Sequence, residues 1–142
     1  MYDYSRMFDN SKMHDYSEMR GNSRMFDSAR MFDNSAMSDY SRMYDWAVLS
    51  GNARLEGGVS LRGFMHVKNA TIKEQKQLFY CSLKARTGIY QLTLYWVDGK
   101  AGFTWGCRDG EDILEYLEVE KYPSNTEKFI RNIVEYLKSE NE

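Results

Sequence analysis

Residues 1–24 read MYDYSRMFDNSKMHDYSEMRGNSR, and a methionine stands at every sixth position after Met1. The methionine column runs to Met43, and leucine or valine continues it in the same register to Val67. The position four residues further along holds only serine or alanine as far as Ala53, and the position two residues along holds aspartate or glycine. A repeat of fixed period is the first guide to architecture, and this one fills half of the chain.

The six-residue period favours strands over helices. Six residues advance a helix by about 600°, which would scatter the methionines over three faces. Six is a multiple of two, so a strand keeps all of them on one side. Each hexad is therefore predicted to be a short strand followed by a corner, with methionine and serine or alanine facing inward. Asp, Asn and Gly tolerate the backbone conformation that such corners need.

The pattern large-apolar, x, Gly/Asp, x, Ser/Ala, x resembles the hexapeptide repeat of left-handed parallel β-helices. Successive hexads match it from Met1 to Ile72. The resemblance implies three hexads per triangular coil, hence about four coils, in which residue n stacks on residue n+18. Methionine in place of Ile, Val or Leu departs from the family pattern, and its flexibility predicts a softer N-terminal half.

The C-terminal half changes character. Strands are expected over residues 77–83, 89–97 and 101–107, with turns at 86–88 and 98–99. Helices are expected after Gly110 and after Pro123, the second capped by the segment 124–127 and buried through Phe129, Ile130, Ile133, Val134 and Leu137. The chain is thus predicted to be mainly β. A left-handed parallel β-helix over residues 1–70 precedes a small α+β domain over 71–142, with a three-stranded antiparallel sheet and two helices.

Composition limits the functional classes. The 142 residues carry a formal net charge of -2, so no global attraction to nucleic acid or to an anionic membrane is expected. No apolar run is long enough to span a bilayer and no signal-peptide pattern appears, so a cytoplasmic protein is expected. Cys81 and Cys107 fit a reducing compartment, and buried free thiols are favoured over a disulfide. No zinc-ligand spacing occurs, so no metal or other cofactor is expected.

Stacking of n on n+18 predicts an interaction face. Its members are Arg6, Arg24 and Arg42, Phe8, Phe26 and Tyr44, with Trp46 and Phe64 at the adjoining corner. Contiguous exposed aromatics usually mark an interface, although an aromatic ladder also stabilises a sheet by itself. We expect this face to be buried in a homo-oligomer, either a dimer or a trimer. Asp9, Asp27 and Asp45 are expected to pair with the arginines. Aromatics of the C-terminal domain could contribute to binding, although alternation along the strands places about half of them in the core. They are Tyr90, Tyr95, Trp96, Trp105 and Tyr116.

The C-terminal domain shows a second resemblance. A hairpin around Asp98-Gly99, the segment Gly106-Cys107-Arg108-Asp109-Gly110 and an acidic helix resemble the tails of hexapeptide-repeat proteins encoded by phages and prophages. Such proteins are mostly of unknown activity, and some phage proteins of this size act against host defence systems. An inhibitor of a host defence protein, in a bacterial or phage-infected cell, is the hypothesis that this context suggests.

Two other functions stay open. Hexapeptide β-helices include acyltransferases that use acetyl-CoA and a histidine base, and His66 is the candidate for that base. A basic joint could instead bind a nucleotide or nucleic acid, although a solvated patch is the plainer interpretation of it. The basic joint consists of Arg54, Arg62, Lys68, Lys73 and Lys76. Non-catalytic binding to a protein partner, with no membrane involved, is the favoured hypothesis.

Overall fold

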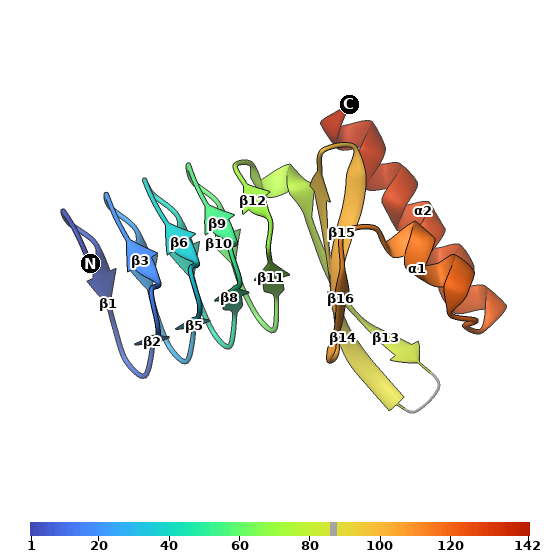
Figure 1. Cartoon of the computed structure of the whole chain (residues 1–142), viewed down its shortest axis with the longest axis horizontal. Coiled ribbons are helices and arrows are strands. Elements are labelled where there is room, and N and C mark those ends of the chain that lie inside the picture. Colours follow the sequence, from blue (N-terminus) through green and yellow to red (C-terminus); the bar gives the residue numbers. More distant parts are fainter. Residues whose placement is uncertain (86–87) are drawn as a thin grey trace. The chain divides into compact units, whose positions relative to one another are not determined.

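The computed structural model describes residues 1–85 and 88–142, which form two compact units, Met1–Gln75 and Lys76–Glu142. The first unit is a four-coil parallel β-solenoid, whose stacked coils are labelled from β1 onward in Figure 1. Sheet A contains β1 (Arg6–Met7), β4 (Arg24–Met25), β7 (Arg42–Met43) and β10 (Ser60–Leu61). Sheet B contains β2 (Lys12–Met13), β5 (Arg30–Met31), β8 (Val48–Ser50) and β11 (His66–Lys68). Sheet C contains β3 (Glu18–Met19), β6 (Ala36–Met37), β9 (Arg54–Leu55) and β12 (Thr71–Ile72).

The repeat column forms the solenoid core, as the period predicts. Met25 pairs with Met43 on the next coil of sheet A, and Met31 pairs with Leu49 on sheet B. The methionines from Met19 to Met43 are fully buried, whereas Met7 and Met13 are half-buried. Small residues fill the space beside them, because Ser23, Ala29 and Ala47 are also fully buried. The inward strip is therefore one large and one small side chain per strand, repeated up the coils.

Aspartate turns most of the corners. Asp9, Asp27 and Asp45 have φ values of 56°, 56° and 55°, and Gly63 completes this corner column with φ 58°. This conformation suits Asp and Asn better than most residues. Each carboxylate also accepts a hydrogen bond from the backbone N–H one coil further on, as from Asp45 N to Asp27 (3.2 Å) and from Gly63 N to Asp45 (2.9 Å). The Asp column thus has two structural tasks, to allow the turn and to link successive coils.

The last hexad is one residue short. Ile72 pairs with Leu55, an offset of 17 residues rather than 18. Asn69 takes the corner conformation (φ 55°), and its side-chain oxygen accepts from Asn52 N over 2.9 Å. Gln75 then hydrogen-bonds the backbone of Ser60, accepting from its N–H (2.8 Å) and donating to its carbonyl (3.1 Å). A side-chain amide therefore takes the place of a neighbouring strand at the end of sheet A.

The second unit follows η1 (Gln75–Gln77) and has an antiparallel sheet of four strands. They are β13 (Leu78–Ala85), β14 (Gly88–Val97), β15 (Lys100–Trp105) and β16 (Arg108–Gly110), in that spatial order. Asp98 and Gly99 have positive φ (52° and 75°) and form the predicted hairpin turn. The predicted turn at residues 86–88 lies mostly outside the described residues.

The fourth strand departs from the sequence prediction, which gave this sheet three strands and assigned residues 108–110 to none of them. Gly106 has φ 58°, so the chain already reverses at Gly106-Cys107 and Arg108 pairs with Trp105. Three residues then suffice for β16, too few to give an alternation signal in the sequence.

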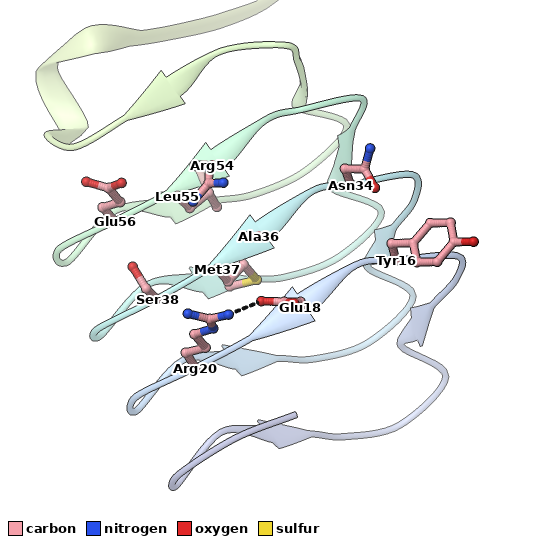
Figure 2. Close-up of a pocket in the computed structure, with 10 residues that line it drawn as sticks. All are labelled: Tyr16, Glu18, Arg20, Asn34, Ala36, Met37, Ser38, Arg54, Leu55 and Glu56. Carbon is pink, nitrogen blue, oxygen red and sulfur yellow. Dashed lines mark hydrogen bonds and ion pairs between the residues drawn. The ribbon is translucent and has the colours of Figure 1, made fainter.

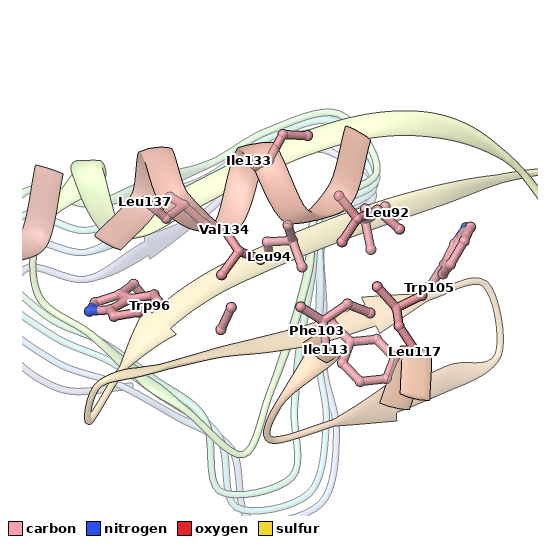
Figure 3. Packing of buried hydrophobic residues seen from close by; sticks show 12 residues of the cluster. Leu92, Leu94, Trp96, Phe103, Trp105, Ile113, Leu117, Ile133, Val134 and Leu137 are labelled. Atoms are coloured by element: carbon pink, nitrogen blue, oxygen red, sulfur yellow. The ribbon is translucent and has the colours of Figure 1, made fainter. Parts of the chain in front are cut away.

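Helices α1 (Ile113–Val119) and α2 (Ser124–Asn141) cover one face of this sheet (Figure 3). Leu94 and Phe103 from the sheet meet Val134 and Leu137 from α2 in one buried cluster. Two details differ from the sequence prediction. Phe129 remains 44% exposed, and α2 begins directly after Pro123 without a side-chain cap, because Ser124 is already helical. In the described part of the chain, no helix is long and apolar enough to cross a membrane.

The double task of the corner aspartates can be tested at Asp45. Asp45→Ala removes the carboxylate that accepts from Gly63 N, and alanine adopts a positive φ less readily than aspartate. We therefore expect the free energy of unfolding to fall by about 1–3 kcal/mol. Asp45→Asn keeps an oxygen acceptor and the tolerance for positive φ, and should cost less than about 1 kcal/mol. Urea unfolding followed by circular dichroism measures both. Equal losses for the two variants would contradict the assignment.

Candidate interaction surface

Sheet A brings the predicted face together. We call the outward columns Arg6, Arg24, Arg42 and Phe8, Phe26, Tyr44 the aromatic-arginine face. Arg6 pairs in register with Arg24, and Arg24 with Arg42, because the strands are parallel with an 18-residue offset. Outward side chains of stacked strands point the same way, so each column is a ladder with a step of about 4.8 Å. The three arginines are exposed.

The aromatic column is a regular stack. The ring centroids of Phe8 and Phe26 lie 4.9 Å apart with an interplanar angle of 4°, and those of Phe26 and Tyr44 lie 5.1 Å apart at 5°. Arg62 continues the column on the fourth coil, with its guanidinium carbon 5.8 Å from the Tyr44 ring centroid. Phe8 is 38% exposed, while Phe26 and Tyr44 are half-buried by their neighbours in the stack. The stack stabilises the sheet and still presents ring edges to the outside.

The expected pairing of this arginine column with the corner aspartates is wrong. Asp9, Asp27 and Asp45 bond to backbone N–H groups of the next coil instead. Within residues 1–85 and 88–142, no carboxylate forms an ion pair with Arg6, Arg24 or Arg42. Arg42 makes only a long contact to the Tyr44 hydroxyl, 3.5 Å. The face therefore carries three arginines without a counter-charge.

A further aromatic pair stands at the corner beside the Asp column. Trp46 and Phe64 stack at 5.3 Å and 9°, and they are 57% and 49% exposed. They follow Asp45 and Gly63 directly in sequence, so the apolar surface extends past the corner in the third and fourth coils.

The residues of the basic joint lie on different faces. Arg62 belongs to the column of sheet A, Lys68 to β11 of sheet B and Arg54 to β9 of sheet C. Lys73 follows β12 and pairs with Glu56 at 3.8 Å, while Lys76 belongs to the second unit. The structure does not gather the four cations of the first unit, Arg54, Arg62, Lys68 and Lys73, into one patch.

His66 has a partner that the sequence analysis missed. Its Nε2 lies 2.7 Å from Ser50 Oγ on the outer surface of sheet B, where β11 and β8 are neighbours. Ser50 and His66 are 16 residues apart, so the stacking rule places them diagonally on adjacent coils. The hexad register would have located this pair, had the outward columns been compared diagonally as well as directly.

Sheet C has a shallow groove of about 590 Å³, which the sequence analysis also missed (Figure 2). Its floor is Ala36 and Ser38, and longer side chains from the coils on either side form its walls. Those wall residues are Tyr16, Glu18, Arg20, Arg54 and Glu56. Glu18 and Arg20 form an ion pair along one wall. The groove exists because the short residues Ala36 and Ser38 lie between long side chains on the preceding and following coils. The two acidic and two basic side chains in its walls have a net charge of zero.

Three of the five aromatics considered for binding on the second unit are internal, close to the half that alternation predicts. Tyr95, Trp96 and Trp105 are buried, because helices cover one face and the Tyr95 ring lies over Gly102 on the other. Tyr90 remains 38% exposed. Tyr116 and Tyr122 share a hydrogen bond of 2.9 Å between their hydroxyls. Burial, and then the bond to Tyr116, raise the pKa of Tyr122 to about 12.

Comparison of the chain with protein-family models, curated proteins and solved structures finds no match. Among the described residues, no group of three or more His, Cys, Asp or Glu could hold a metal ion. The geometry of the outward columns is therefore the basis for assigning a function.

The cysteines provide a test of the second unit. Both are free thiols, but only Cys81 is partly buried, whereas Cys107 is exposed, contrary to the expectation of two buried thiols. Burial raises the pKa of Cys81 above its ordinary value, so less of it is thiolate at pH 8. We expect two phases with Ellman's reagent, a fast one from Cys107 and a slow one from Cys81. Cys107→Ser should leave only the slow phase. A single phase from both thiols would contradict the structure.

Proposed function

We propose that the protein is a non-catalytic binding protein whose interaction surface is the aromatic-arginine face. The observation that supports this most directly is the column Arg6, Arg24 and Arg42, in register and without a carboxylate partner beside a stacked aromatic column. Arginine and aromatic residues are enriched at protein interfaces and supply most of their binding energy. The partner that suits three uncompensated guanidinium groups is a protein surface rich in carboxylates.

A nucleic acid suits this face less well. Bases bind aromatic residues by stacking on a free ring face. Both faces of Phe26 are already covered, by Phe8 and by Tyr44. Only ring edges are available in the middle of the column, and these fit the apolar part of a protein interface.

A more specific version of the proposal rests on the resemblances in sequence. The hexad pattern supports a left-handed hexapeptide-repeat solenoid, and the segment from Asp98-Gly99 to Gly110 supports kinship with phage-encoded members. In this version the partner is a host or bacterial protein, met in the cytoplasm of a bacterial or phage-infected cell. The second unit adds the contacts that make binding specific.

The contact between Ser50 and His66 supports a second candidate function. An acyltransferase of this kind uses a histidine base that takes a proton from the acceptor group of the substrate, and the 2.7 Å contact places Nε2 of His66 within hydrogen-bonding distance of a hydroxyl oxygen, here that of Ser50. In this alternative acetyl-CoA would be the acyl donor.

The binding proposal can be tested by charge reversal at matched positions. Arg24 and Arg30 are both exposed, and each is the first residue of a strand in the second coil. Arg24 lies on sheet A, whereas Arg30 lies on sheet B. We expect the immobilised full chain and Arg30→Glu to retain the same discrete protein from a bacterial lysate, and Arg24→Glu to lose it by at least about tenfold. Circular dichroism would confirm that both variants are folded. Equal retention by all three, or retention of nothing above background by a chain that is also monomeric, would reject the proposal.

Calorimetry with coenzyme A separates the second candidate from the first. The binding proposal predicts no heat of binding. The acyltransferase alternative predicts binding, together with transfer of the acetyl group from acetyl-CoA to an added hydroxyl or amine acceptor or to water, which releases free coenzyme A and which His66→Ala abolishes. Binding without turnover in either protein would reject His66 as a base.

A further inference from the structure

We propose that the aromatic-arginine face joins two copies of this chain, related by a two-fold axis parallel to the solenoid axis. In this contact each arginine of one copy pairs with the corner aspartate at the same coil of the other. The inference rests on the proposed function, because it names the acidic protein surface that this face binds.

The order of the columns makes the face complementary to itself. Each coil of sheet A presents, from one side to the other, an arginine, an aromatic residue and a corner aspartate, for example Arg24, Phe26 and Asp27. A two-fold rotation about an axis parallel to the solenoid preserves the height of each coil and reverses this order. Arg24 then faces Asp27 of the second copy, Asp27 faces its Arg24, and the Phe26 rings oppose each other.

The period restricts the partner further. Three arginines spaced by about 4.8 Å can all be paired only by carboxylates with the same spacing. Residues along a strand that share one face repeat every 6.6 Å or so, and would match one arginine and miss the next. A second copy of the solenoid has the required spacing in the column Asp9, Asp27 and Asp45, at the same heights. The fourth coil has neither of these two charges, since Ser60 and Gly63 occupy those positions, and its charge on this face is Arg62 in the central column.

Each corner aspartate can also accept a further hydrogen bond from a guanidinium group. One oxygen of each carboxylate accepts a backbone N–H of the next coil, at 3.5 Å for Asp9, 3.2 Å for Asp27 and 2.9 Å for Asp45. The second oxygen has no hydrogen bond among the residues that the structure describes. A carboxylate accepts more than one hydrogen bond, so a guanidinium can bind without breaking the corner. Because the backbone holds the carboxylate, little side-chain freedom is lost on pairing.

The expected affinity is modest. The face is three to four short strands long, so it buries less than the ~800 Å² per partner of a standard interface. Trp46 and Phe64 stand next to the Asp column and would add apolar area from each copy. The combination favours a dimer with a dissociation constant in the micromolar range and a marked dependence on salt.

Sedimentation equilibrium of the full chain between about 5 and 200 µM tests the contact. We expect a monomer-dimer equilibrium that Arg24→Glu weakens at least about tenfold, by placing like charges opposite Asp27. Asp27→Asn keeps the corner and its backbone hydrogen bond, and should weaken the dimer as well. Arg30→Glu, on sheet B, should leave it unchanged. A monomer at all concentrations, or a dimer that Arg24→Glu does not affect, would overturn the inference.

Two outcomes separate this inference from the function on which it rests. A monomeric chain that still retains a foreign protein, with retention lost in Arg24→Glu, would reject self-association and keep the binding face. A dimer and a retained protein that are both insensitive to Arg24→Glu would reject the two together.

Discussion

The solenoid depends on a corner at every sixth residue, three of which complete one coil. Asp, Asn or Gly takes a positive φ there, from Asp3 to Asn69, and the strands of two or three residues between corners have no room to absorb an error. Because the corner period is even and constant, methionine and small residues stay inside and the other positions stay outside. The same constraint sets the offset of 18 residues between coils, which turns single outward side chains into ladders. The arginine column, the aromatic stack and the corner carboxylates are all consequences of it.

The sequence predicted this unit well because the information was local and repeated. Every hexad contains its own inward residue and its own corner, so the coils and their register follow without long-range packing. Gln75 bonding to Ser60, and the offset of 17 at Ile72, were not predictable, since each occurs once and depends on three-dimensional proximity. In the second unit the long strand and the Asp98-Gly99 hairpin were recognisable. The short strand Arg108–Gly110 was not, because pairing with Phe103–Trp105 alone defines it.

The sequence analysis predicted which residues lie together on the candidate face, but it did not predict how their charged groups are paired. Stacking arithmetic correctly placed Arg6, Arg24 and Arg42 beside the aromatic column. The same arithmetic shows which columns are neighbours but not which groups form hydrogen bonds. It therefore treated Asp27 as a partner of Arg24, although the donor to Asp27 is the backbone N–H of Asp45 on the next coil. The Ser50–His66 contact and the groove over Ala36 were missed for a related reason. Both arise from diagonal neighbours or from differences in side-chain length, which a column-by-column comparison does not register.

The central claim is that the aromatic-arginine face meets its own copy with the coils in register. Disulfide trapping tests it most directly, with Phe26→Cys in a chain where Cys81 and Cys107 are both replaced by serine. The two-fold arrangement places residue 26 opposite residue 26 of the other copy, so mild oxidation should give a covalent dimer. Phe32→Cys, on sheet B in the same background, should stay monomeric. No cross-link at residue 26, or cross-linking of equal extent at residue 32, would contradict the account.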